Sequence, residues 1–500
     1  MVASTTDVTR TPAREQRGGV RVRALARRLP SQPMHVVMLL VAAVGLVRIA
    51  GPLSDVDLWW HVRLGEEMLD RHSLTGVATD WSFAPIHTDW VSSEWIGEVV
   101  LAAVHGAFGW VGVSWLRVLL AAWLFYRLYR LVVPGRSPLV ASLVFTVTAT
   151  WIGVSVQERP QLVSLLLLTW LARHARDMLR GEDGPRWWAV LGVVAFWANV
   201  HGLWVLAPFA CAVVALARLA DGGPDAPRSA RRPVVLALVA VVGGCLTPLG
   251  PRSLLLPFTL KGATHAIVEW GPTVLADVTS FGVVLLTVPV LVAWARSGFR
   301  VPRSEVVYVL ALLAFAMVAF RSLPPALILL APVYADRLCV SWPRPTIPPR
   351  PVERVVLATL GCVVAVAGVV APVTRLVTGD PLPRETMALD IAARLAHEPG
   401  EHRVLNSYNT SGVLLLFGGP RTRLAIDGRA DRYGGAYVDR YLRALALGGD
   451  WRGLVRELRP THAVLATDAP LLQMLRVDGW RVVVDDDHGY TLLEPPRSRR

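Results

Sequence analysis

Cysteine is scarce in this sequence, and its few cysteines stand apart from one another. They fall in or beside apolar stretches, no two of them form a Cys-x-x-Cys pair, and the polar C-terminal region has none: Cys211, Cys245, Cys339 and Cys362. This spacing argues against a disulfide scaffold or a cysteine zinc site. We interpret the four thiols as small buried apolar groups.

Charge is also sparse. Charged residues make up 18% of the chain, hydrophobic residues make up 53%, and the mean hydropathy is +0.44. This balance excludes an ordinary soluble protein. Apolar runs near the ~20 residues needed to cross a bilayer recur along most of the chain. We therefore expect a polytopic α-helical membrane protein, embedded in a lipid bilayer, with a small C-terminal α/β domain.

Lysine is almost absent, because Lys261 is the only lysine among 51 basic residues. In a soluble domain, a net charge of +13 would suggest nucleic acid as a partner. Here the arginines gather in short loops between apolar runs, where membrane topology explains them, so we expect no nucleic-acid partner. A glycine-rich phosphate loop is missing as well, since Gly418–Gly419 and Gly434–Gly435 indicate turns.

The apolar runs predict about eleven transmembrane helices. Their expected limits are 34–53, 112–133, 137–156, 160–178, 186–200, 202–220, 232–248, 280–296, 305–320, 323–338 and 354–375. Arginine-rich loops alternate with arginine-poor ones, and the positive-inside rule assigns the basic set and the N-terminus to the cytoplasm. The alternation requires that Trp95–Phe108, which carries Glu98 and His105, lies along the membrane surface and does not cross it.

This topology divides the chain into three parts. Residues 1–33 form a basic, disordered cytoplasmic tail, and residues 34–376 form the transmembrane module, whose outer loop 54–111 contains in-plane helices. Residues 380–496 form an extracytoplasmic α/β domain. Its expected strands are 403–406, 423–426, 462–466, 480–484 and 490–493. Its expected helices are 385–397, 436–446, 451–458 and 470–475. No small-residue cleavage site follows the first apolar run, which predicts an uncleaved first helix.

The loop Ser54–Glu94 is unusually acidic. Only Arg63 and Arg71 oppose its acids, which are Asp55, Asp57, Glu66, Glu67, Asp70, Asp80, Asp89 and Glu94. Glu66, Glu67 and Asp70 are expected on the solvated face of a short helix. Because the loop lies outside the cytoplasm, the activated sugars within its reach are lipid-linked and not nucleotide-linked. A polyprenyl-phosphate sugar would place its phosphate at the headgroup level, beside this loop.

Several polar residues fall at the expected outer ends of the spans. Charged groups so close to hydrocarbon are costly, which favours a functional interpretation of the set: Arg159, Asn199, His201, Arg252, Lys261, Glu269 and Arg321. Transfer of a sugar needs a general base on the acceptor hydroxyl, for which a carboxylate is suited. It also needs cations on the leaving phosphate. The candidate cations are Arg63, Arg159, Arg252, Lys261 and Arg321.

A series of motifs then follows in order along the chain. They are Asp55-Val56-Asp57-Leu58-Trp59-Trp60-His61, Asp80-Trp81-Ser82-Phe83, Trp90-Val91-Ser92-Ser93-Glu94-Trp95, Arg159-Pro160-Gln161, Trp197-Ala198-Asn199-Val200-His201-Gly202, Thr247-Pro248-Leu249-Gly250, Glu269-Trp270 and Ile426-Asp427-Gly428-Arg429-Ala430-Asp431. With these motifs the chain resembles the GT-C superfamily of integral-membrane glycosyltransferases. Within it, the chain looks most like a bacterial group allied to protein mannosyltransferases and aminoarabinose transferases.

The resemblance implies a helical bundle in the bacterial plasma membrane, with a catalytic base at Asp55 or Asp57 and a second acid at Glu94. We expect phosphate or sugar contacts at His61, Arg63, Arg159, Gln161, Asn199, His201, Glu269 and Arg321. Aminoarabinose transferases have a phosphate-binding lysine after the second acid, where this chain has Trp95. We therefore favour Arg159 or Arg321 for that role. Relatives often carry histidine where Ser93 stands, which weakens a metal site there and leaves a divalent metal open.

The main hypothesis is an inverting glycosyltransferase that moves a sugar from a polyprenyl-phosphate donor to an extracytoplasmic glycan, lipid or protein acceptor. The alternative is a non-catalytic protein of the same fold that binds glycan or lipid-linked intermediates in cell-envelope assembly. In that alternative the tail motif Asp427, Arg429 and Asp431 matters most, although a structural ion-pair turn is the favoured interpretation of it. A transporter is disfavoured because no internal repeat is evident.

Overall fold

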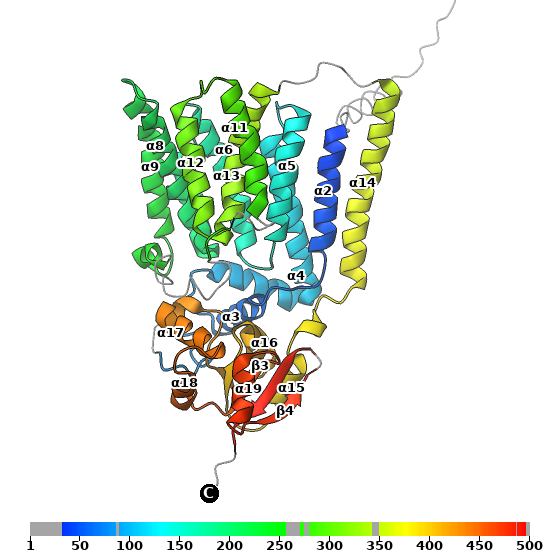
Figure 1. The fold of residues 1–500 in the computed structure, drawn as a ribbon, viewed down its shortest axis with the longest axis vertical. Coiled ribbons are helices and arrows are strands. Elements are labelled where there is room, and N and C mark those ends of the chain that lie inside the picture. The colour runs from blue at the N-terminus through cyan, green and yellow to red at the C-terminus, as the bar shows by residue number, and fades with distance from the viewer. Residues whose placement is uncertain are drawn as a thin grey trace, which may run out of the picture.

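The computed structural model describes residues 33–86, 90–256, 271–274, 280–342, 350–486 and 488–496. Most of them form long helices that run side by side in one layer (Figure 1). These are α2 (Pro33–Ile49), α4 (Trp95–Val132), α5 (Pro138–Val154), α6 (Gln161–Leu179), α7 (Trp187–Val200), α8 (Leu206–Ala220), α9 (Ala226–Gly244), α11 (Phe281–Arg296), α12 (Arg303–Val318), α13 (Leu323–Ser341) and α14 (Pro351–Thr378). A helix therefore occupies every segment that the sequence predicted to cross the membrane. The predicted tail 1–32 lies outside the described residues.

Four of the described helices are long and apolar enough to cross a membrane. They cover Trp95–Val132, Gly202–Ala220, Phe320–Ser341 and Pro351–Thr378. Shorter apolar helices stand beside them at Pro33–Ile49, Pro138–Val154, Trp187–Val200 and Phe281–Arg296. The helix α13 lies inside the bundle, where 78% of its most apolar 18-residue stretch is buried. The helix α14 lies at the edge and packs against α2 (Figure 1). Only 17% of the corresponding stretch of α14 is buried. This arrangement supports the expected multi-pass membrane protein.

The helix α4 changes direction at Gly109. This residue has a φ of 61° and a ψ of −164°, a conformation that glycine adopts far more readily than other residues. Before Gly109 the helix lies across the ends of the upright helices, and after it the helix turns into the bundle (Figure 1). This bend fits the surface orientation that the predicted topology required for Trp95–Phe108.

The C-terminal part of the chain forms a five-stranded sheet with the order β2-β1-β3-β5-β4. The strands are β1 (His402–Asn406), β2 (Thr422–Leu424), β3 (His462–Ala466), β4 (Arg481–Asp485) and β5 (Tyr490–Glu494). The strand β1 pairs in parallel with β2 and β3, and β5 pairs antiparallel with β3 and β4. Each predicted strand is confirmed to within two residues at either end.

The helices of this part are α15 (Leu389–His397), α16 (Ser411–Phe417), α17 (Ala430–Leu445), α18 (Trp451–Leu458) and α19 (Pro470–Val477). Three of them differ from the prediction, one of them because α15 begins four residues later than expected. The sequence analysis missed α16, and it placed a turn at Gly434–Gly435 where α17 continues through a kink with a φ of 74° at Gly434. The chain does change direction at Gly434, whose backbone is not helical, so the glycine introduces a kink within α17 in place of a separate turn.

The first loop and the C-terminal part interlock. The helix α3 (Leu58–Arg71) of the loop and the helix α16 share one hydrophobic cluster that includes Leu58, Trp59, Val413 and Leu424. The backbone of the loop also joins the edge of the sheet, because Ser82 forms a parallel bridge with Leu424. The two parts that the sequence predicted as separate regions are thus packed into one layer below the bundle (Figure 1).

Candidate functional site

An arginine joins the two aspartates that follow the first span. The Arg159 Nε donates to Asp55 Oδ2 at 2.5 Å, and its Nη2 lies 3.0 Å from Asp57 Oδ2. Asp55 is 2% exposed, and its Oδ1 accepts the N–H of Asp57 at 2.8 Å. The side chain of Asp57 is 21% exposed, and its Oδ1 accepts the indole N–H of Trp60 at 3.0 Å. Of the two carboxylates, Asp57 is therefore the one within reach of a substrate.

A second ion pair, Arg117–Glu158, was not predicted from the sequence and lies next to the backbone of Asp55. Arg117 Nη1 donates to Glu158 Oε1 and also to the carbonyl of Pro52. Glu158 Oε2 in turn accepts the backbone N–H of Asp55 at 3.1 Å. Both side chains are buried, so the pair fixes the backbone of Asp55 from within the protein. A signal was present, because a charge such as Arg117 inside an apolar span needs a partner.

Burial and the neighbouring charges shift the acid chemistry of Asp55. Burial raises the pKa of Asp55 to about 6, with the Asp57 carboxylate contributing in the same direction and Arg159 opposing it. An acid in this range changes its protonation state just below neutral pH. The ionised form of Asp55 is the one that can hold Arg159 by a charge-assisted hydrogen bond.

A second polar group surrounds Glu94, directly before α4. Burial raises the pKa of Glu94 to about 7, while His61 and Arg321 act in the opposite direction. The His61 ring lies 3.3 Å from Glu98 Oε1, and Glu98 Oε2 is buried without a hydrogen-bond partner among the described atoms. Burial would lower the pKa of His61, but Glu98 outweighs it and the net shift is upward. A buried, mixed group of acids and cations thus adjoins the aspartate pair.

The neighbours of His201 define its tautomer. Its Nδ1 accepts the backbone N–H of Leu203 at 3.2 Å and lies 3.0 Å from Ser164 Oγ. Burial lowers the pKa of His201 well below its usual value, with Arg321 acting in the same direction. The neutral imidazole then carries its proton on Nε2, which faces Glu94 Oε1 at 3.7 Å. In this arrangement His201 presents an N–H donor to the site.

Other predicted residues lie apart from the two acid groups or serve the packing. Arg63 lies 3.9 Å from Glu66 on the same helix. The Asn199 amide is fully engaged, with Oδ1 accepting from Trp95 at 2.7 Å and Nδ2 donating to two backbone carbonyls. Gln161 begins α6, directly after the Arg159-Pro160 corner. Two further candidates, Lys261 and Glu269, lie outside the described residues.

One prediction about the solvated face of α3 is wrong. Glu67 is only 11% exposed and accepts the N–H of Ala78 at 3.0 Å and the indole N–H of Trp81 at 3.0 Å. The carboxylate organises the loop that follows α3, because it supplies acceptors for donors that the loop would otherwise bury unpaired.

The tail motif clamps the loop to the sheet. Arg429 and Asp427 form a buried pair with hydrogen bonds of 2.9 Å and 2.7 Å. The Arg429 guanidinium lies 4.7 Å from the Trp81 ring and 5.0 Å from the Trp90 ring. Asp431 accepts the indole N–H of Trp90 at 2.9 Å. The geometry favours the structural interpretation of the motif, because its charges face the loop of the same chain.

The same motif contacts the hydrogen-bond partner of Asp57. Gly428 packs so closely on Trp60 that an added Cβ would lie 2.1 Å from the indole Nε1, the atom that donates to Asp57. Only glycine fits such a close approach. The tail therefore contributes to the position of the more exposed aspartate.

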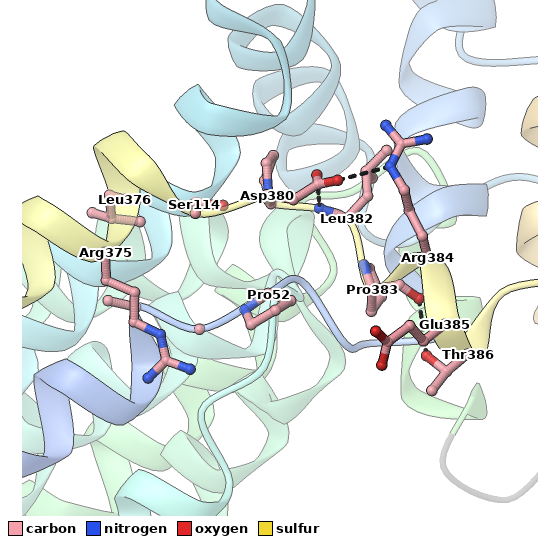
Figure 2. A pocket seen from close by; sticks show the side chains of 14 residues that line it. Pro52, Ser114, Arg375, Leu376, Asp380, Leu382, Pro383, Arg384, Glu385 and Thr386 are labelled. Carbon is pink, nitrogen blue, oxygen red and sulfur yellow. Dashed lines mark hydrogen bonds and ion pairs between the residues drawn. The ribbon is translucent and has the colours of Figure 1, made fainter.

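A cavity of about 520 Å³ lies between the ends of α2 and α14 and the segment 379–386. Figure 2 shows Arg375 at one side of it and Arg384 with Glu385 at the other. Its wall also includes Gly51 and Ser114, but none of the predicted site residues. Among the residues that the structure describes, the acids of the first loop do not bring three metal-ligand atoms together.

Two solved structures of other proteins are similar to this one. The chain is similar in structure to ArnT from Cupriavidus metallidurans in the apo state, with a TM-score of 0.50, 14% identity and coverage of 96% of this chain and 98% of that chain. It is also similar to the oligosaccharyltransferase of Archaeoglobus fulgidus tethered with an acceptor peptide, with a TM-score of 0.47, 12% identity and coverage of 87% and 69%. No family model and no curated protein matches the sequence.

The similarity to ArnT, an aminoarabinose transferase, extends over nearly the whole of both chains. At 14% identity the similarity shows the fold alone. The protein shares the fold of ArnT, which agrees with the GT-C resemblance carried by its sequence motifs.

Proposed function

We propose that this protein transfers a sugar from a polyprenyl-phosphate donor to an acceptor outside the cytoplasm. The observation that carries the proposal is the pair Asp55–Asp57, bound by Arg159. The neighbouring group of His61, Glu94 and His201 lies close enough for the charges of Asp57 and Arg159 to act on it. The group lies at the end of the helix bundle where α4 runs across it (Figure 1). A lipid phosphate held at the membrane surface would meet these side chains.

We assign the general base to Asp57. Asp55 is nearly inaccessible, and both of its oxygens are occupied by Arg159 and by the backbone of Asp57. Asp57 retains an exposed edge, and two donors orient its carboxylate. In this assignment Asp55 is a positioning residue that holds Arg159, and Arg159 orients the carboxylate of Asp57.

The transfer is a single displacement at the anomeric carbon. Asp57 takes the proton from the acceptor hydroxyl as its oxygen bonds to that carbon, and the carbon–phosphate oxygen bond breaks with its electron pair. The polyprenyl phosphate leaves, and the configuration inverts. Arg321 and the Nε2–H of His201 would receive the developing charge on the phosphate, because Arg159 is engaged by two carboxylates. Glu94 would position the acceptor.

The proposal includes a membrane topology. The eleven helical segments, with α4 lying on the surface before Gly109, would put the N-terminus in the cytoplasm of a bacterial cell. They would put the first loop and residues 380–496 outside the plasma membrane. A site on that side draws on lipid-linked sugars. Cysteine labelling of Thr75→Cys and Ser229→Cys would test the topology directly. Position 75 is predicted to lie outside the membrane, and position 229 is predicted to lie in the cytoplasm.

Transfer in membranes supplied with a polyprenyl-phosphate sugar tests the base. Asp57→Asn should lower the rate by about 10²- to 10⁴-fold, the usual contribution of a general base. Asp70→Asn is the matched control, since Asp70 is an exposed acid on the same helix. Undiminished transfer by Asp57→Asn, at an unchanged expression level, would remove Asp57 from the mechanism.

The non-catalytic alternative draws on the tail, which covers the loop through Arg429 and Trp90. Deletion of 380–500 cannot distinguish the two functions, because it would expose the hydrophobic cluster that the loop and the tail share. Binding of lipid-linked sugar without any transfer, in wild type and in Asp57→Asn alike, would instead favour the alternative.

A further inference from the structure

Three metal-ligating side chains meet at the end of the sheet remote from the tail motif. His462 is the first residue of β3 and Glu494 is the last of β5. The antiparallel register, with Ala463 opposite Leu493, puts the two directly across from each other. Glu398, which follows α15, approaches from the side. The ligand atoms of the three residues all lie within 4.8 Å of one another.

The imidazole at the centre of this group is buried and oriented. Its side chain is 8% exposed, and its Nδ1 lies 2.9 Å from Thr461 Oγ1. The Thr461 hydroxyl can accept from Nδ1–H, and in that tautomer Nε2 carries no proton and is available as a ligand. Nε2 lies 3.7 Å from Glu398 Oε1, longer than a hydrogen bond. Nε2 therefore points at two carboxylates without bonding to either one.

The carboxylate of Glu398 is also incompletely satisfied. Its Oε2 is buried and has no hydrogen-bond partner among the described atoms. A buried polar atom without a partner costs about 1–3 kcal/mol, so its presence needs an explanation. Glu494 gives one oxygen to Arg481 at 2.5 Å, which leaves the other for a further ligand. Two observations therefore concern the same cluster: the Oε2 of Glu398 has no hydrogen-bond partner among the described atoms, and the Nε2 of His462 lies near Glu398 Oε1 without a hydrogen bond to it.

We propose that Glu398, His462 and Glu494 form a binding site for a divalent transition-metal ion of the zinc class. One imidazole with two carboxylates suits such an ion, whereas the oxygen-only sets preferred by Ca²⁺ and Mg²⁺ do not include imidazole. The ion would tie α15 to two strands of the sheet. This site is independent of the proposed transferase chemistry.

Zinc binding by the full-length protein in detergent, purified without a histidine tag and stripped with a chelator, tests the proposal. We expect one Zn²⁺ per chain by metal analysis and a rise in the thermal midpoint on Zn²⁺ addition. Glu398→Gln and His462→Gln should each weaken Zn²⁺ binding at least ~10-fold. Glu401→Gln is the matched control, because that exposed acid is paired with Arg423 and should bind as wild type does.

Glu398→Gln keeps the test decisive even if His462→Gln fails to fold, since Glu398 lies on the surface side of the group. Equal Zn²⁺ affinity in wild type and Glu398→Gln would overturn the proposal, and so would the absence of stoichiometric binding in wild type. Without stoichiometric Zn²⁺ binding, the three side chains would form only a structural cluster of charges.

Discussion

Replacing Glu94 by glutamine should stabilise the protein above neutral pH and leave it little changed in acid. The Glu94 side chain is 23% exposed, and its pKa is raised from 4.5 to about 7. A raised pKa means that the folded protein binds this proton more tightly than the unfolded chain does. The unfolding free energy of the wild type therefore falls as pH rises from about 4.5 to about 7, and it stays lower above that range.

The magnitude follows from the size of the shift. One pKa unit corresponds to about 1.4 kcal/mol, so ionised Glu94 costs the folded state on the order of 3 kcal/mol. Glutamine carries no charge and avoids this cost. The net gain will be smaller than that figure, because the charge of Glu94 helps to raise the pKa of His61. The protonated imidazole therefore loses a partner in Glu94→Gln.

Thermal unfolding in detergent between pH 5 and pH 8.5, followed by the fluorescence of the 19 tryptophans, measures this effect. The gap between Glu94→Gln and wild type should open as pH rises. Glu457→Gln is the control, because Glu457 is an exposed acid paired with Arg440. Parallel curves for Glu94→Gln and wild type across the whole range would refute the reasoning, as would a gap that widens toward acid.

Three further predictions concern the same layer. Transfer should fall as pH drops through about 6, because protonated Asp55 no longer holds Arg159, and Asp55→Asn should flatten this limb of the pH–rate profile. Gly428→Ala should destabilise by about 1–3 kcal/mol through the clash with Trp60; equal thermal midpoints for the variant and wild type would contradict the contact. Arg429→Ala should cost about 3–5 kcal/mol, since it leaves Asp427 buried and unpaired; protease sensitivity of the first loop at wild-type level would argue against the clamp.

Much of the bundle was predictable from the sequence because apolar length alone marks a helix in a membrane. Convergence of Arg159 with Asp55 and Asp57 was predictable for a related reason. The sequence assigned Arg159, before α6, and Asp55 and Asp57, after α2, to the same side of the bilayer. Charged groups near hydrocarbon are costly unless they pair with opposite charges. The pair Arg117–Glu158 follows the same logic, yet hydropathy averages out a single charge within a span.

The interlocking of loop and tail could not be predicted in the same way. The contacts join Trp90 to Asp431 and Ser82 to Leu424, over separations of more than 300 residues. The local sequence of each segment gives no indication of the distant segment that it contacts. The helix α16 was not predicted because its seven residues are too few to show a helical period. Its apolar side chains are buried by packing against α3.

This interlock changes how the tail motif should be interpreted. Gly428 presses on Trp60, and Trp60 donates to Asp57, so the tail helps to set the orientation of the proposed base. A tail substitution that abolishes transfer would therefore not show that the tail binds acceptor. A loss confined to the rate, with the Michaelis constant for acceptor unchanged, would indicate misplacement of Asp57, whereas a rise in that constant alone would indicate acceptor binding by the tail.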